Sequence, residues 1–223
     1  MNRFLFVLSA HSGYSSGMTI PVDSSEAVSE PSSWSDPFPE PQWTALDGGS
    51  KRERLLCAAG TVFARDGLDA SMPAVAAAAG AGVASVYRIF PSKRDLIAAL
   101  VTRRLEQIAA AATEAITAGG DHWEALTGML WTLVERQQAD DFLGETRSLV
   151  AEHPDVEAAT AHASEALDSL LAAAMAEGRL RADATNLDLR LLFAATRAAK
   201  QVEPAAWRRV LELFIDALER ADD

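Results

Sequence analysis

From Ser50 onward, apolar residues recur at the spacing of an α-helix. Between Ser50 and Arg65, one helical face collects Leu55, Leu56, Ala59, Val62 and Phe63. Ser50 and Glu53 have the spacing of a capping box, and Gly67 follows where a left-handed residue commonly ends a helix. The pattern therefore predicts a first helix over residues 50–65.

The rest of the chain reads as a series of further helices with no strand signal. Abundant alanine favours helix throughout. Ser71 can cap a second helix, in whose first turn Pro73 costs little. The later expected helices cover about Gly82–Ile89, Ser92–Thr117, Asp121–Gln138, Phe142–Glu152, Pro154–Ala176 and Asn186–Lys200, with a last one that starts at Pro204. We expect an all-α protein of about nine helices.

Residues 1–49 lack any such period. Five prolines fall between positions 21 and 41 among many serines, which predicts a disordered tail over 1–49. The opening MNRFLFVLSA resembles a signal peptide, but its apolar run from Phe4 to Leu8 is too short for one. A true translation start at Met18 stays open. No stretch approaches the ~20 apolar residues of a membrane span, so we expect a cytoplasmic protein with no membrane partner.

Charge is distributed unevenly along the chain. The net charge is −12, yet the segment from Lys51 to Arg104 holds nine Lys and Arg against four Asp and Glu. The remaining residues hold 11 basic and 28 acidic side chains. A basic module on an acidic body is typical of a protein whose one end binds nucleic acid.

The segment from Ser71 to Asp95 has the spacing of a helix-turn-helix. Two short helices that cross at about 90–120° need a small residue at their contact, a residue free to adopt positive φ in the turn, and an apolar plug from the second helix. Ala76, Gly80 and Val86 meet these three requirements. A nucleotide-binding glycine loop is a poorer interpretation of Gly80 and Gly82, because no strand precedes them.

The expected outer face of the second short helix carries groups suited to DNA. The hydroxyls of Ser85 and Tyr87 suit phosphate oxygens. Arg88 can reach a phosphate or a guanine edge, and Val83 and Ala84 can contact thymine methyl groups. Ser92 would cap the next helix, whose first amides and Lys93 would form a second phosphate clamp. The candidate DNA-binding residues are Ser71, Val83, Ala84, Ser85, Tyr87, Arg88 and Lys93.

Residues 51–95 resemble the DNA-binding domain of TetR-family repressors. The family pattern Leu/Val-Tyr-x-x-Phe-x-x-Lys is matched by Val86-Tyr87-Arg88-Ile89-Phe90-Pro91-Ser92-Lys93. The resemblance implies phosphate contacts for Ser85, Tyr87 and Lys93, and a helical regulatory domain whose last two helices dimerise. Gly82 stands where the family usually has a Ser or Thr cap, Ile89 stands where His or Tyr is common, and a lysine near the start of the recognition helix is missing. These departures concern which operator is read.

This resemblance divides the chain into a DNA-binding domain over 50–95 and a regulatory domain over 96–223. We expect an effector pocket in the latter to use some of Trp123, Trp131, Phe142, Met175 and Phe193, although plain core positions are an open alternative. Arg147 and Arg197 are candidates to anchor an anionic effector or are simply solvated. The expected dimer interface comprises Leu191, Trp207, Leu211, Phe214 and Leu218.

No catalytic or metal-binding pattern stands out. Histidines do not occur in pairs at i and i+4, and the one cysteine, Cys57, excludes a disulfide within the chain and reads as a small core residue rather than a redox sensor. We expect no cofactor and no enzymatic activity. The hypothesis is a homodimeric repressor that a small-molecule effector releases from a near-palindromic double-stranded DNA operator. The alternative is a helical ligand-binding or scaffold protein that keeps the fold without binding DNA.

Overall fold

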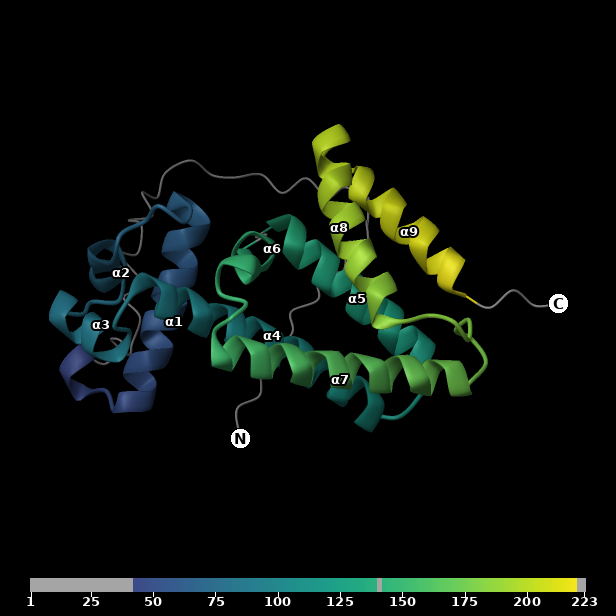
Figure 1. Ribbon diagram of the computed structural model, residues 1–223, viewed down its shortest axis with the longest axis horizontal. Helices are drawn as coiled ribbons and strands as arrows, with labels where there is room; N and C mark the ends of the chain where they lie inside the picture. The colour runs from purple at the N-terminus through teal and green to yellow at the C-terminus, as the bar shows by residue number, and fades with distance from the viewer. Residues whose placement is uncertain (1–41, 140–141, 220–223) are drawn as a thin grey trace, which may run out of the picture. The chain divides into compact units, whose positions relative to one another are not determined.

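The structure is a computed structural model that describes residues 42–139 and 142–219. Most of the predicted tail, its signal-like start and Met18 lie outside these residues. The helices, in chain order, are α1 (Gly48–Asp66), α2 (Met72–Ala78), α3 (Val83–Ile89), α4 (Lys93–Thr117), α5 (His122–Ala139), α6 (Phe142–Thr146), α7 (Pro154–Ala176), α8 (Asn186–Val202) and α9 (Ala206–Leu218), with 3-10 turns η1 (Trp43–Ala45) and η2 (Arg147–Leu149) (Figure 1). The described residues contain no strand beyond one isolated bridge, so the all-α prediction is confirmed.

The first helix begins earlier than its sequence pattern predicts. Asp47, not Ser50, is the N-cap of α1, and its carboxylate accepts the Ser50 backbone N–H at 2.8 Å and the Ser50 hydroxyl at 2.9 Å. These bonds lower the pKa of Asp47 below its ordinary value. The predicted Ser50 cap is therefore wrong, because an acidic residue three positions earlier satisfies the same free amides. Helical structure at η1 also places Trp43 outside the predicted disorder.

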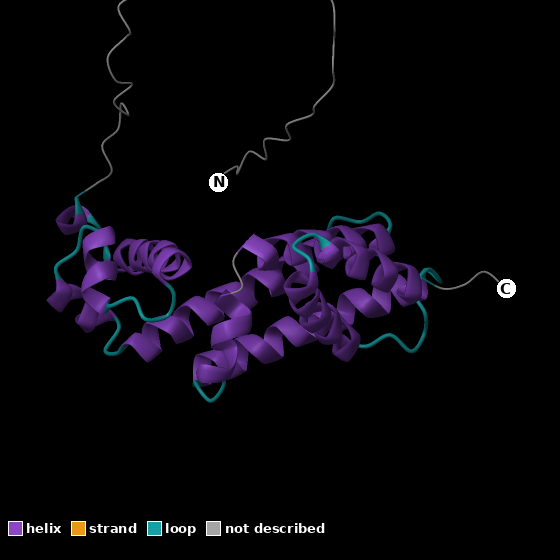
Figure 2. Cartoon of the chain, turned by 90° about the horizontal axis from the view of Figure 1, so that it is seen from above, coloured by secondary structure: helices purple, strands orange, loops and turns teal. Residues whose placement is uncertain are grey.

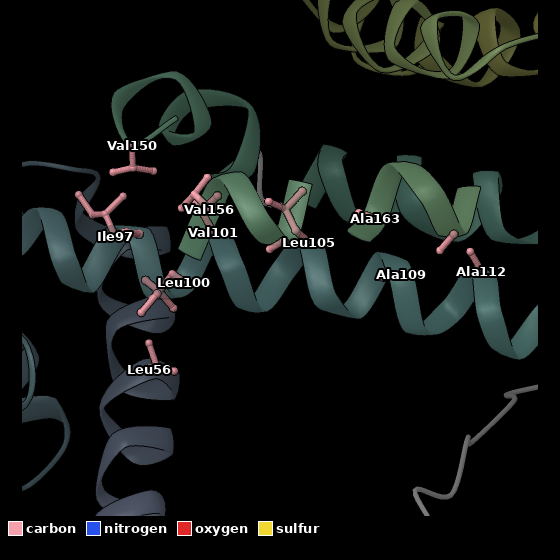
Figure 3. Close-up of a cluster of buried hydrophobic side chains, with 14 of the residues drawn as sticks. Leu56, Ile97, Leu100, Val101, Leu105, Ala109, Ala112, Val150, Val156 and Ala163 are labelled. Carbon is pink, nitrogen blue, oxygen red and sulfur yellow. The ribbon is translucent and has the colours of Figure 1, made fainter. Parts of the chain in front are cut away.

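The predicted helix over 142–152 is also wrong in its second half. The α-helix stops at Thr146, whose buried hydroxyl donates to the Phe142 carbonyl at 2.5 Å, and a 3-10 turn follows. This break lets the chain bury Val150 in the cluster that includes Ile97 of α4 (Figure 3). Tertiary packing thus overrides a run of residues with helical propensity. Smaller differences occur at α8, which continues to Val202, and at α9, which begins after Pro204.

Helices α1, α2 and α3 gather around the N-terminal end of α4 (Figure 2). Their shared core holds Leu55, Val62, Val75, Val86, Phe90 and Leu96, each no more than 1% exposed.

Among the described residues, no single helix is both long and apolar enough to cross a bilayer; only the bent pair α2–α3 passes that test by length and composition.

The most extensive helix–helix packing among the described residues is between α4 and α7, which run side by side (Figure 3). Small residues such as Ala109, Ala112 and Ala163 let the two backbones approach closely. Beyond this core, His162 Nδ1 lies 2.8 Å from Glu106 Oε2. Helices α8 and α9 pack on each other and on α5. The result is one long helix, α4, that belongs to both the N-terminal cluster and the C-terminal helices.

We predict opposite effects of two Gly→Ala substitutions on the free energy of unfolding. Gly80 has φ of 65°, so Gly80→Ala should destabilise the protein by about 1–2 kcal/mol. Gly60 lies inside α1 with open space at its Cβ position, so Gly60→Ala should stabilise by about 0.5–1 kcal/mol. Urea denaturation at equal protein concentration measures both. Equal effects of the two substitutions would contradict the positive-φ turn.

Candidate functional sites

The α2–turn–α3 unit has the geometry that its sequence spacing predicts. The two helices are bent by 106° relative to each other, with Gly80 at positive φ in the turn. Ala76 and Val86 are 1% and 0% exposed, so both serve as the contact between the helices. Ser71 caps α2, and its hydroxyl accepts the Ala74 N–H at 3.3 Å. One side of α3 therefore packs against the core through Val86, and its other side faces solvent.

The free side of α3 carries most of the candidate DNA-binding residues. Tyr87 is 45% exposed and Val83 is 40% exposed. Ala84 and Arg88 are also exposed, while Ser85 is half-buried. Positions 83, 84, 87 and 88 lie on one helical face, because 87 follows 83 by four residues and 84 by three, and 88 follows 84 by four. A hydroxyl, a guanidinium and two small apolar side chains therefore share one solvent-facing surface.

Lys93 occupies a more constrained position than the other candidates. Its ammonium donates to the Leu68 carbonyl and lies 5.8 Å from the centroid of the Phe63 ring. Ser92 caps α4 in a reciprocal capping box with Asp95, in which the Asp95 carboxylate accepts the Ser92 N–H at 2.9 Å. Lys93 thus ties the loop after α1 to the start of α4, and two of its three N–H groups remain for another acceptor.

Basic side chains of α1 lie on aromatic rings near this unit. The Arg52 guanidinium is 4.6 Å from the centroid of the Phe90 ring, and the Lys51 ammonium is 6.0 Å from that of Trp43. These contacts orient positive charge without neutralising it. Trp43 was missed by sequence reasoning because it stands at the end of the proline-rich stretch, outside any helical period.

A cavity of about 550 Å³ lies among the C-terminal helices. Its walls come from α4, α5, α7 and α8, together with the segment formed by α6 and η2. The apolar lining includes Leu105, Ile108, Leu130, Leu133, Leu167, Leu189 and Phe193. The basic lining comprises Arg104, Arg136, Arg147, Arg190 and Arg197. Among the described lining residues there is no Asp or Glu.

The cavity uses few of the residues that the sequence suggested. Phe193 lines it, as do Arg147 and Arg197. The other four expected aromatic and Met side chains lie elsewhere: Trp123 and Met175 pack in the core, Trp131 meets the Trp207 ring edge-on at 6.2 Å, and Phe142 stacks on Phe63 at 5.9 Å. Most of the large aromatic side chains thus fill space between the helices, while leucines, Ile108, Phe193 and arginines line the cavity.

Arg147 and Arg190 form an unusual pair in the cavity wall. Arg147 is half-buried in η2, and its burial together with the positive charge of Arg190 lowers the pKa of Arg147 below its ordinary value. A guanidinium nevertheless stays protonated near neutral pH. Within the described part of the chain, neither arginine forms an ion pair with a carboxylate. Sequence reasoning had no signal for Arg190, which helical spacing places on a solvent-facing position.

Helices α8 and α9 expose most of the large apolar side chains on the described surface. Leu187, Leu191, Val202 and Leu213 are each at least half exposed. Three of the residues expected at a dimer interface, Trp207, Leu211 and Leu218, are instead buried within the protomer. Phe214 is half-buried and Leu191 is exposed. The clean apolar stripe of α9 is therefore mainly the face that packs inward, and the expected dimer interface stays a prediction.

The single cysteine of the chain lies on the surface rather than in the core. Cys57 is exposed on α1, with its Sγ 3.6 Å from Arg103 Nη1, so the expectation of a core cysteine is wrong. Position 57 lies off the stripe of buried residues that includes Leu56 and Ala59. In residues 42–139 and 142–219, no three His, Cys, Asp or Glu side chains are grouped so as to hold a metal ion.

The chain is similar to known bacterial regulators both in sequence and in fold. The family model for "Bacterial regulatory proteins, tetR family" matches residues 55–100. The HTH-type transcriptional repressor KstR of Mycolicibacterium smegmatis is 33% identical over 131 residues, which are 57% of this chain and 64% of the repressor. This match thus spans less than two thirds of that relative's length.

Two solved structures extend the similarity over the regulatory helices. The TetR regulator SCO0520 of Streptomyces coelicolor aligns with a TM-score of 0.60 at 25% identity, over 77% of this chain and 99% of its own. The TetR transcription regulatory protein of Mycobacterium vanbaalenii aligns with a TM-score of 0.56 at 31% identity, over 76% of this chain and 95% of its own. With the helix-turn-helix and the C-terminal helices both matched, the chain belongs to the TetR family of bacterial regulatory proteins.

Proposed function

We propose that this protein is a homodimeric transcriptional repressor that binds a near-palindromic DNA operator and leaves it when a small molecule occupies the cavity. The observation that carries the proposal is the two-sided α3, which is anchored by Val86 and presents Tyr87 and Arg88 to solvent. A short helix held at 106° to its neighbour suits insertion into a major groove.

In this proposal, Tyr87 and Lys93 contact phosphates, Ser71 and Ser85 add hydroxyl contacts, and Arg88 reaches a phosphate or a guanine. Val83 and Ala84 supply apolar contact with thymine methyl groups. The absence of a side-chain cap on Gly82 supports a close approach of the α3 backbone to DNA, since no bulky group stands at the helix start.

The proposed dimer joins the α8 and α9 faces of two protomers. Leu187, Leu191 and Val202 recur along α8 at spacings of 4 and 11 residues, so they lie on one side of the helix. Leu213 adds an exposed apolar side chain from α9. An exposed apolar surface of this kind is characteristic of a protein interface. Two-fold symmetry would then set two α3 helices about 34–36 Å apart, or a multiple of this distance.

Helix α4 offers a route from the cavity to the DNA-binding helices. Its first half packs Leu96 and Leu100 in the N-terminal cluster, while Arg104, Leu105 and Ile108 one to two turns later line the cavity. His153, the N-cap of α7, lies 3.9 Å from Asp95 in the capping box of α4. An effector that moves α4 would change the separation of the two α3 helices. A differential affinity of a few kcal/mol between the two forms suffices.

We predict that Tyr87→Phe and Arg88→Ala each weaken DNA binding. Loss of a hydrogen bond to a charged phosphate costs about 1.5–3 kcal/mol, or roughly 10- to 100-fold in affinity. Arg88→Ala should also reduce the slope of log K against log salt by about 1. Gel-shift titrations with DNA from upstream of the protein's own gene, and with unrelated DNA of equal length, measure both effects.

Arg181→Ala is the control for these variants, because Arg181 lies after α7 and pairs with Asp183, away from α3. Its DNA affinity should equal that of the wild type. If Tyr87→Phe and Arg88→Ala bind as tightly as the wild type, α3 is not the DNA-contacting helix. If the wild type binds neither DNA, the alternative of a helical ligand-binding protein without DNA binding gains support.

Leu191→Asp should convert the dimer into monomers, since a carboxylate buried in an apolar interface loses its hydration without a partner. Sedimentation equilibrium or light scattering at micromolar concentration measures the mass. Leu149→Asp, at a similarly exposed leucine on η2, is the matched control and should remain dimeric. A dimer that survives Leu191→Asp would place the interface on another surface.

A further inference from the structure

The strongest unexplained feature is a pair of like charges in an apolar cavity wall. Arg147 of η2 and Arg190 of α8 both line the cavity, and their positive charges repel each other. The surrounding wall is largely aliphatic, with Leu105, Leu133 and Leu167 among its members. Arg147 is half-buried, whereas Arg190 is exposed. Within the described residues, the Arg147 guanidinium is thus partly removed from water beside a like charge and without a carboxylate counter-ion, which is unfavourable on its own.

The remaining polar groups of the cavity are partly committed to the protein itself. The side-chain amide of Gln137 donates to the Phe193 carbonyl at 2.9 Å, and that of Asn186 donates to the Ser164 carbonyl at 3.1 Å. Arg147 and Arg190, by contrast, have no carboxylate partner within the described residues. The donors most available to a bound molecule are therefore cationic, and cationic donors bind oxyanions most strongly.

We infer that the cavity binds an apolar molecule with one oxyanionic head group, a carboxylate or a phosphate, whose charge pairs with Arg147 and Arg190 while its apolar body lies along the leucine-lined wall. The inference rests on the proposed function, in that it names the chemical class of the effector. The cavity volume of about 550 Å³ falls within the ~300–1,000 Å³ typical of small-molecule sites.

The test titrates the full-length protein with dodecanoate, dodecyl phosphate and dodecan-1-ol by isothermal calorimetry, each below its micellar concentration. The three probes share an apolar chain and differ in the head group. At least one anion should bind about 10-fold or more tightly than the alcohol, because charged hydrogen bonds add to the apolar contact. The tighter of the two anions identifies the head group as carboxylate or phosphate.

Two variants link the charge preference to the named arginines. Arg147→Gln and Arg190→Gln should each weaken anion binding by roughly 10-fold and leave alcohol binding unchanged. Arg65→Gln, which removes an exposed charge paired with Asp66 on α1, is the matched control and should not alter anion affinity. Thermal unfolding of each variant verifies that it is folded, since neither arginine has a carboxylate partner among the described residues and its removal should not lower Tm.

Equal affinities for the alcohol and both anions would overturn the inference, as would failure of both anions to bind or unchanged anion affinity in both arginine variants. Gel shifts with and without the bound anion separate this inference from the proposed function. If the anion binds through Arg147 and Arg190 but DNA affinity is unaffected, the inference stands and effector-controlled release fails. If DNA is never bound, the calorimetry still decides the inference.

Discussion

The fold depends on one helix, α4, whose buried side chains join the packing of the N-terminal helices to that of the C-terminal helices in one hydrophobic core. Near its N-terminus, Leu100 lies in the cluster with Leu56 of α1, and farther along, Ala109 and Ala112 face α7 (Figure 3). A helix of 25 residues is about 37 Å long and bends little. One continuous helix therefore reaches both the helices around its N-terminus and the cavity wall.

This constraint explains why the proposed DNA-binding surface needs so few specialised residues. Helix α3 has only seven residues and would not be stable alone. The buried side chain of Val86 and the turn at Gly80 fix its orientation instead. The exposed face is then free to carry the residues that suit an operator, so changes there need not disturb the core.

In the cavity wall, unlike on the exposed face of α3, residues with a proposed role in binding reduce stability. Leucines from several helices form its walls, yet Arg147 and Arg190 place positive charge beside them without a carboxylate partner among the described residues. Such an arrangement costs stability unless an anion compensates it. The net charge also differs along the chain: the chain as a whole is acidic, whereas the N-terminal helices are basic. Both ends thus use arginine, one toward the proposed duplex and the other toward the proposed effector.

The sequence by itself determined the helical class, most helix boundaries, the helix-turn-helix and the exposed Tyr87, because these depend on local periodicity, caps and the spacing of Ala76, Gly80 and Val86. Only the tertiary structure decided the break after Thr146, the cavity lining, and which face of α9 is buried. Each of these depends on contacts between residues far apart in the chain. An amphipathic pattern shows that one face of a helix is apolar. Tertiary packing decides whether that face contacts its own protomer, a ligand or a second copy of the chain.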